Sequence, residues 1–299
     1  MSTPTDPRQE HPSTYVVQDR SNEEELTRLQ IQDQMLTAGM GGVLPEQPDP
    51  TRFQRVLDVG CGTGGWLIEA AKTYPAMSLL VGADVSSRMV EYARTQAEAQ
   101  QVSDRVQFAT MDALRMLEFP TDNFDLVNQR LGQSYLRTWD WPKLLHEFQR
   151  VTRPGGVIRV TESDINENTS PALTRLLEIS LDAFYRAGHF FTPDGNGVTS
   201  QLAGLLHQYG LQNVQTRAYP LEYRAGTAQG QRFYEDMRHT FRTALPFLRK
   251  WSRLPDDYET IYQQMLSEMQ QPDFVAIWNL LTAWGNKPPR KKKTAPMPE

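Results

Sequence analysis

The residues with the clearest chemical potential lie in the stretch VLDVGCGTGG, where an apolar run leads directly into a cluster of glycines. A bare loop between a strand and a helix lets backbone N–H groups approach a ligand closely. The spacing fits two patterns. Gly60, Gly62 and Gly65 form G-x-G-x-x-G, which binds the pyrophosphate of a dinucleotide. Asp58, Gly60, Gly62 and Gly64 form D-x-G-x-G-x-G, a loop that would face a nucleoside without a phosphate.

Three acidic residues follow three successive apolar runs. Asp58 would repel a pyrophosphate, whereas it can hold loop amides or face an ammonium group. Asp84 follows Gly64 by 20 residues and can accept both hydroxyls of a ribose. Asp112 can accept from the exocyclic amine of an adenine, although an Asp at a strand end often only caps a helix. Together with the glycine loop, the three acids favour a nucleoside ligand.

Elements that could position these residues alternate along the chain. Apolar runs separated by amphipathic segments predict an α/β fold, a Rossmann-like, seven-stranded, mostly parallel sheet with helices on both faces. The expected strands of the first half are 55–60, 78–84, 105–110, 123–129 and 157–163. Ligands of such sheets bind at the carboxyl ends of the strands, where the glycine loop and the three acids would meet.

The chain is expected to divide into six segments. These are a disordered tail 1–14, a helical cap and linker 15–50, a core 51–225 (166–199 partly a lid), a helical insert 226–271, a closing strand 272–286 and a disordered tail 287–299. The cap helix is expected to pack through Leu26, Leu29 and Met35 or Leu36. The apolar run 274–285 fits a strand or a helix equally well.

Composition limits the class of protein. The net charge of −5 gives no general attraction to nucleic acid or an anionic membrane, and no apolar run reaches the length of a membrane span. The N-terminus lacks a basic start followed by an apolar stretch, and the single cysteine fits a reducing compartment. A cytoplasmic protein without nucleic-acid or membrane partners is expected, with its oligomeric state open.

Several motifs together resemble a known family. VLDVGCGTG, GADVSSRMVEYAR, FATMDA, FDLVNQRL and LLHEFQRVTRPGGVIRVTE follow one another between about residues 50 and 165. They resemble class I S-adenosylmethionine (SAM)-dependent methyltransferases, especially the ubiquinone/menaquinone-type small-molecule methyltransferases with a methyltransferase domain 11/25-like core. The resemblance implies SAM as cofactor, S-adenosylhomocysteine (SAH) as product, and in-line transfer of a methyl group to a small-molecule acceptor.

The resemblance also implies which residues bind the cofactor. They are Arg28 and Gln32 closing over its tail, Asp58, Gly60, Cys61, Gly62 and Gly64 around the methionine moiety, Asp84 at the ribose, Val85, Met89, Met111, Asp112 and Ala113 at the adenine, and Asn128, Gln129 and Arg130 near the tail. Cys61 has no base beside it in the sequence, which favours a small residue that fits over a nucleophile.

A catalytic base is optional, because orientation alone can supply about 7–11 kcal/mol. If a base is used, His189 is a candidate beside Phe190 and Phe191, and packing against these rings is the alternative. Glu162 and Asp164 lie at the end of the fifth expected strand and could bind or deprotonate an acceptor. No metal is expected, because the fourth strand ends in VNQR without a carboxylate.

The acceptor is expected to be apolar or aromatic, with transfer to O, N or C left open. Candidate lining side chains are Phe184, Tyr185, Phe190, Phe191, Phe233, Tyr234, Met237 and Phe241, although most could form helical cores. Two alternative functions stay open, an NAD-type oxidoreductase and a non-catalytic SAM-binding regulatory module.

Overall fold

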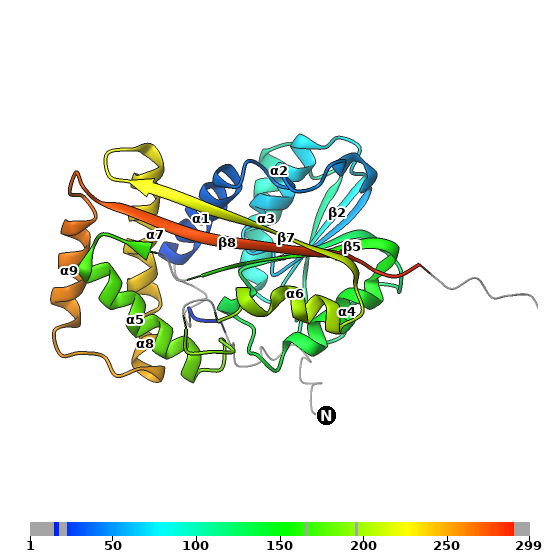
Figure 1. Ribbon diagram of the computed structural model, residues 1–299. Coiled ribbons are helices and arrows are strands. Elements are labelled where there is room, and N and C mark those ends of the chain that lie inside the picture. The colour runs from blue at the N-terminus through cyan, green and yellow to red at the C-terminus, as the bar shows by residue number, and fades with distance from the viewer. Residues whose placement is uncertain (1–14, 18–22, 165–166, 195–196, 290–299) are drawn as a thin grey trace, which may run out of the picture.

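The structure, a computed structural model, describes residues 15–17, 23–164, 167–194 and 197–289. The tail expected over 1–14 and most of the tail expected over 287–299 lie outside these ranges. A twisted sheet runs through the molecule with helices on both of its faces, and a further group of helices packs at one end (Figure 1). The predicted Rossmann-like α/β fold is confirmed.

The described residues form one sheet of eight strands in the order β3-β2-β1-β4-β5-β8-β6, with β7 also paired to β8. The strands are β1 (Arg55–Val59), β2 (Leu79–Asp84), β3 (Val106–Thr110), β4 (Phe124–Arg130), β5 (Thr152–Ser163), β6 (Glu167–Asn168), β7 (Gln212–Arg224) and β8 (Val275–Asn286). Strands β1 to β5 pair in parallel, and β8 is antiparallel to β5 and β7. The sequence predicted seven strands, and the extra one is the two-residue β6, which pairs with β8.

Helices follow the strands as expected. They are α1 (Glu23–Gly39), α2 (Gly65–Thr73), α3 (Ser87–Ala99), α4 (Trp141–Val151), α5 (Pro171–Arg186), α6 (Thr199–Gln208), α7 (Ala228–Thr243), α8 (Leu245–Trp251) and α9 (Tyr258–Glu268), with short 3₁₀ turns η1 (Pro50–Arg52) and η2 (Gly132–Ser134). The side chain of Ser170 accepts from the N–H of Leu173 at the start of α5, where Pro171 is the first helical residue. None of the helices in the described ranges is long and apolar enough to cross a bilayer.

The core strands are buried on both faces because side chains alternate along a strand. Val56 of β1 packs with Trp66 and other residues of α2 and α3, whereas Leu57 packs with Phe148 and other residues of α4. Figure 1 shows α2 and α3 over one face and α4 and α6 over the other. Because β1 to β5 are parallel, their carboxyl ends lie along one edge of the sheet.

The strands β7 and β8 reach beyond the other strands toward the third helix group (Figure 1). There Tyr223 of β7 and Trp278 of β8 join a core with residues of α1, α5, α7, α8 and α9. The run that fitted a strand or a helix equally well is therefore the strand β8. A helical layer is thus held against the edge at which the core strands end.

Candidate functional site

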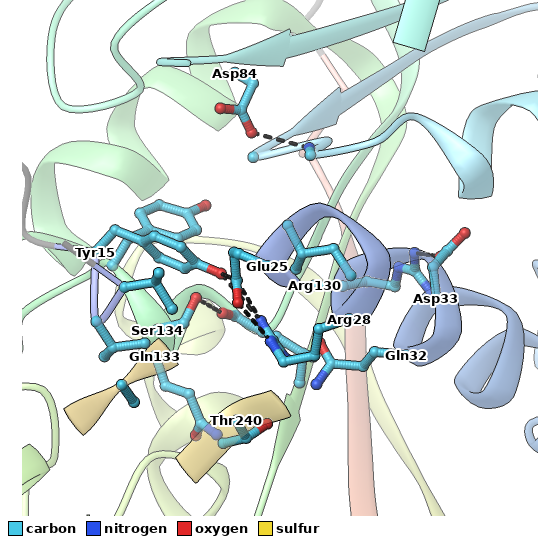
Figure 2. Close-up of a pocket in the computed structure, with 18 of the residues that line it drawn as sticks. Tyr15, Glu25, Arg28, Gln32, Asp33, Asp84, Arg130, Gln133, Ser134 and Thr240 are labelled. Carbon is cyan, nitrogen blue, oxygen red and sulfur yellow. Dashed lines mark hydrogen bonds and ion pairs between the residues drawn. The ribbon is translucent and has the colours of Figure 1, made fainter. Parts of the chain in front are cut away.

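A cavity of about 450 Å³ lies at the carboxyl ends of the core strands. Its walls come from the loops after β1 to β5, from α1, α5 and α7, and from β8. Figure 2 shows Asp84 on one side of the cavity, Thr240 on the opposite side, and Glu25 with Arg28 between them. The loop that the sequence singled out therefore shares one enclosed space with the helical layer.

The three glycines of the loop have different roles, although all have positive φ, +70° at Gly60, +51° at Gly62 and +75° at Gly64. A Cβ at Gly60 would lie 2.7 Å from the Tyr135 hydroxyl, and a Cβ at Gly64 would lie 2.6 Å from the Phe108 ring. A Cβ at Gly62 would meet no atom within 4 Å. Gly60 and Gly62 line the cavity, whereas Gly64 packs against β3.

Two of the three acids also organise the loops that carry them. Asp84 accepts the N–H of Gly62 at 2.9 Å and the N–H of Ser86 at 2.9 Å. Asp112 accepts the N–H of Leu114 at 2.9 Å in a turn, and no helix begins there, so the capping alternative is wrong. Both acids still line the cavity, together with the predicted Val85, Met89, Met111 and Ala113.

Asp58 is the buried end of a chain of hydrogen bonds. It accepts from Nδ2 of Asn128 at 2.7 Å, and Oδ1 of Asn128 accepts from Nη1 of Arg159 at 2.8 Å. The Nε of Arg159 donates to Glu46 at 2.8 Å, and both of these side chains have no exposed surface. We call these four residues the Asp58 network. Burial raises the pKa of Asp58 to about 7, although Arg130 and Asn128 oppose the shift.

Only one of the three residues expected near the cofactor tail lines the cavity. Arg130 lines the cavity and forms an ion pair with Asp33 of α1. Asn128 and Gln129 are fully buried and do not line the cavity. The side chain of Gln129 instead donates to Glu162 at 3.1 Å.

The helix α1 buries charged residues against the cavity. Arg28 donates to both oxygens of Glu25 at 2.7 and 2.8 Å and to Asp236 of α7 at 3.3 Å, and Tyr15 donates to Glu25 at 2.5 Å. Gln32 also donates to Asp236, at 3.4 Å. We call these five residues the Arg28 cluster. The polar atoms that were expected to close over the cofactor tail thus bind other side chains of the protein.

The Arg28 cluster corrects part of the expected packing of α1. Met35 and Leu36 are buried as expected, but Leu26 and Leu29 are only half-buried, whereas Glu25 and Arg28 are buried. Burial disfavours the charge of Glu25, yet contact with Arg28 leaves its pKa below the usual value. Burial raises the pKa of Asp236 to about 6, with Arg28 opposing the shift. The sequence carries no sign of this contact, because Arg28 and Asp236 are 208 residues apart.

Two of the candidate bases lie outside the cavity wall. His189 is 1% exposed, burial lowers its pKa to about 4, and its ring lies 5.6 Å from that of Phe184 and 5.7 Å from that of Phe247. Glu162 has no exposed surface and accepts the N–H groups of Gly132 at 2.7 Å and of the next residue at 3.1 Å. His189 therefore packs among aromatic rings, as its alternative predicted, and Glu162 holds the loop after β4.

Cys61 lines the cavity, and burial together with the charges of Asp84 and Asp58 raises the pKa of its thiol well above the usual value. A protonated thiol is a poor nucleophile, in agreement with its interpretation as a small residue that fits. In the described part of the chain, no three His, Cys, Asp or Glu side chains are grouped as metal ligands.

The far half of the cavity is largely apolar. Of the eight aromatic and methionine candidates, Phe184, Phe190, Met237 and Phe241 line it. Further apolar lining residues are Leu36, Leu131, Leu177, Ala244 and Trp278. This half is therefore suited to an apolar ligand.

Comparison with known proteins locates the likeness in the core. Residues 56–156 match a family described as a methyltransferase domain. A demethylmenaquinone methyltransferase of Lactiplantibacillus plantarum is 39% identical over 100 residues, which are 33% of this chain and 41% of that protein. Methyltransferase GfsG of Streptomyces halstedii is 32% identical over 138 residues, 45% of this chain and 47% of that protein. The matched segments span less than half of either relative.

The fold likeness extends further than the sequence likeness. A phosphoethanolamine N-methyltransferase 2 of Haemonchus contortus, solved with phosphomonomethylethanolamine and SAH, has a TM-score of 0.55 at 19% identity. The superposition covers 91% of this chain and 60% of that one. The arrangement of the sheet and helices is thus shared well beyond residues 56–156.

Proposed function

We propose that this class I SAM-dependent methyltransferase transfers the methyl group of SAM to a small apolar or aromatic acceptor. The observation that carries the proposal is a single cavity with two chemically different halves. The glycine loop and the three acids form one half, and apolar side chains of α5, α7 and β8 form the other. A cofactor and an acceptor bound in the two halves would meet inside the protein.

The first half has the groups that SAM requires. Gly62 leaves open space beside the backbone of the loop. Asp58 lines the cavity next to this space and would bind the ammonium group of the cofactor. Asp84 would bind the ribose hydroxyls, and Asp112 would accept from the adenine amine, with the apolar Met111 beside the ring.

The contribution of the chain to the reaction would be orientation and the exclusion of water. SAM supplies an electrophilic methyl group on a sulfonium sulfur. Tyr15, Val16 and Val17 lie on the cavity wall, where the N–H of Val16 donates to the carbonyl of Ser134 at 3.0 Å. Val16 and Val17 are 8% and 2% exposed, so this segment shields the cavity from solvent. Holding two reactants in line can contribute about 7–11 kcal/mol.

The two alternatives are less well supported. A dinucleotide would place a pyrophosphate near Asp58, whose buried carboxylate would repel it. A regulatory module that only bound SAM would have no use for the apolar half beyond the cofactor. The cavity therefore favours methyl transfer over both.

Calorimetric titration with SAH and separately with NADH tests this assignment. We expect SAH to bind and NADH not to bind. Asp84→Ala should abolish SAH binding, because it removes a cavity carboxylate and the partner of the Gly62 N–H. Asp104→Ala removes an exposed carboxylate of the same type and should bind SAH as the unmodified protein does. Binding of NADH alone, or unchanged SAH affinity in Asp84→Ala, would contradict the proposal.

A further inference from the structure

Acidic side chains outnumber basic side chains around the cavity. Six carboxylates and two guanidinium groups line it. Arg130 is paired with Asp33, and Arg28 is shared between Glu25 and Asp236. Every arginine that lines the cavity in the described ranges therefore already has a carboxylate partner.

Carboxylates also outnumber guanidinium groups in the half of the cavity proposed for the acceptor. If the proposed function holds, SAM occupies Asp58, Asp84 and Asp112, which leaves Asp164 and the Arg28 cluster for the acceptor. The Arg28 cluster sets two carboxylates against one guanidinium. Because charges interact more strongly away from bulk water, this half repels an anionic acceptor and attracts a cationic one.

Polar atoms that could bind an acceptor lie in the same half. Gln133 is anchored through Nε2, which donates to Ser163 at 2.8 Å, and its Oε1 is buried without a partner. Asp164 follows Ser163 on the cavity wall, and its carboxylate accepts from the Thr199 hydroxyl. Thr240 of α7 also has a buried hydroxyl oxygen without a partner. Figure 2 shows Gln133 and Thr240 on the side of the cavity away from Asp84.

Buried polar atoms without partners are costly, so the Gln133 oxygen indicates a ligand that brings a donor, and the Thr240 hydroxyl can bind either a donor or an acceptor. Burial raises the pKa of Asp164 above its usual value, which makes this carboxylate a better proton acceptor near neutral pH. Phe184 and Phe190 supply ring faces in the same half, and such faces attract organic cations.

Resting on the proposed function, we propose that the acceptor is an amine with an apolar body, whose nitrogen donates to Gln133 and loses a proton to Asp164. The ammonium form gives one proton to the Asp164 carboxylate. The freed lone pair on nitrogen forms the bond to the methyl carbon, while the carbon–sulfur bond breaks and its electron pair stays on sulfur. The amine leaves as an N-methylammonium ion, and SAH remains.

Three compounds with one apolar body test the charge preference. Tryptamine, tryptophol and indole-3-acetate carry an ammonium, a hydroxyl and a carboxylate on the same ring system. They are titrated into protein that is saturated with SAH, so failure of SAH to bind would identify a failure of the proposed function itself. We expect tryptamine to bind at least about tenfold more tightly than indole-3-acetate. Equal or tighter binding of indole-3-acetate, or no binding of tryptamine to the SAH complex, would overturn the amine proposal.

Two variants separate Asp164 from the general negative charge of the protein. Asp164→Asn should remove most of the preference for tryptamine and leave SAH affinity unchanged. Asp182→Asn replaces an aspartate of α5 that does not line the cavity, and this control should keep the preference for tryptamine. If both variants keep the preference, or both lose it equally, Asp164 does not have the role proposed. Methylation of phosphoethanolamine in preference to tryptamine would also contradict an apolar acceptor.

Discussion

At the scale of a single residue, the burial of Asp58 and its proposed role favour opposite protonation states. It is 3% exposed, and burial raises its pKa to about 7. Its proposed role requires the ionised carboxylate, because a protonated Asp58 has no charge with which to attract an ammonium group. Arg130 and Arg159 favour the ionised form, whereas Asp33 opposes it.

The affinity for SAH should therefore depend on pH. In the proposed site the ammonium group of SAH would bind the ionised form of Asp58, so affinity should rise with pH through about 7 and level off above it. Calorimetric titration at pH 6 and pH 8 measures the difference. Asp58→Asn should bind SAH weakly with little change between the two values. Affinity that falls from pH 6 to pH 8 would exclude the proposed role of Asp58.

Alanine substitutions at Gly62 and Gly64 should have different effects on stability and on SAH binding. At Gly64 the new Cβ would lie 2.6 Å from Phe108, so we expect a loss of about 1–3 kcal/mol in the free energy of unfolding from overpacking. At Gly62 no clash arises, and the positive φ alone should cost about 1–2 kcal/mol. Denaturant unfolding of the SAH-free protein and SAH titration measure both effects. Gly62→Ala should weaken SAH binding more than its stability change explains. The reverse pattern would contradict these roles.

At the scale of elements, the Asp58 network connects three neighbouring strands to the segment before β1. Asp58 lies on β1, Asn128 on β4 and Arg159 on β5, while Glu46 precedes η1. The hydroxyl of Tyr219 on β7 also donates to Glu46, at 3.2 Å. The orientation of Asp58 in the proposed cofactor site therefore depends on β1, β4 and β5 being neighbours in the sheet.

Arg159→Met should affect both stability and binding. It leaves Glu46 buried without a counter-charge, which should cost about 3–5 kcal/mol in the free energy of unfolding. It also removes a positive charge that lowers the pKa of Asp58, so the rise in SAH affinity should move to higher pH. Unfolding curves and SAH titrations over pH measure the two effects.

Arg153→Met is the matched control, because Arg153 lies on the same strand with a 52% exposed side chain. It should leave the pH profile of SAH binding unchanged. Glu46→Gln removes the negative charge that is paired with Arg159, so it should shift the profile in the opposite direction from Arg159→Met, to lower pH. A purely structural role for Arg159 would lower stability in both network variants without moving either profile.

The elements were predictable where local patterns decide them. Alternating apolar runs placed β1 to β5, and the glycine loop and three acids lie together on the cavity wall, in the half that we propose for the cofactor. The buried face of α1 was predicted correctly at Met35 and Leu36 but not in its first half, because leucine spacing cannot reveal that Arg28 meets Asp236 from a distant helix. His189 was chosen as a histidine beside aromatic residues and Glu162 for its place at the end of the fifth strand, and only the fold shows that neither lines the cavity.

At the scale of the whole molecule, several buried carboxylates have raised pKa values. Burial raises the pKa of Asp58 and Glu162 to about 7 and that of Asp236 to about 6. A carboxylate whose pKa is higher in the folded than in the unfolded state binds more protons when folded. Its contribution to stability is full below the unfolded pKa and is lost as pH rises through the folded value.

The free energy of unfolding of the SAH-free protein should therefore fall between pH 5 and pH 8 through these groups. Glu162→Gln removes one of them, so its stability should fall less over the same range, as measured by denaturant unfolding at both values. Glu178→Gln changes an exposed residue of α5, and its free energy of unfolding should fall as much as that of the unmodified protein. A steeper fall in Glu162→Gln would show that Glu162 is not protonated in the folded protein at pH 5.

The position of β8 has a consequence for how the protein is made. The last strand of the described chain lies between β5 and β7, inside the sheet, and it supplies Trp278 to the cavity wall. A ribosome releases β8 after the other strands of the described chain, so the edges of β5 and β7 that pair with it stay unpaired until then. We therefore expect the cavity wall to be complete only after β8 has been synthesised and has entered the sheet.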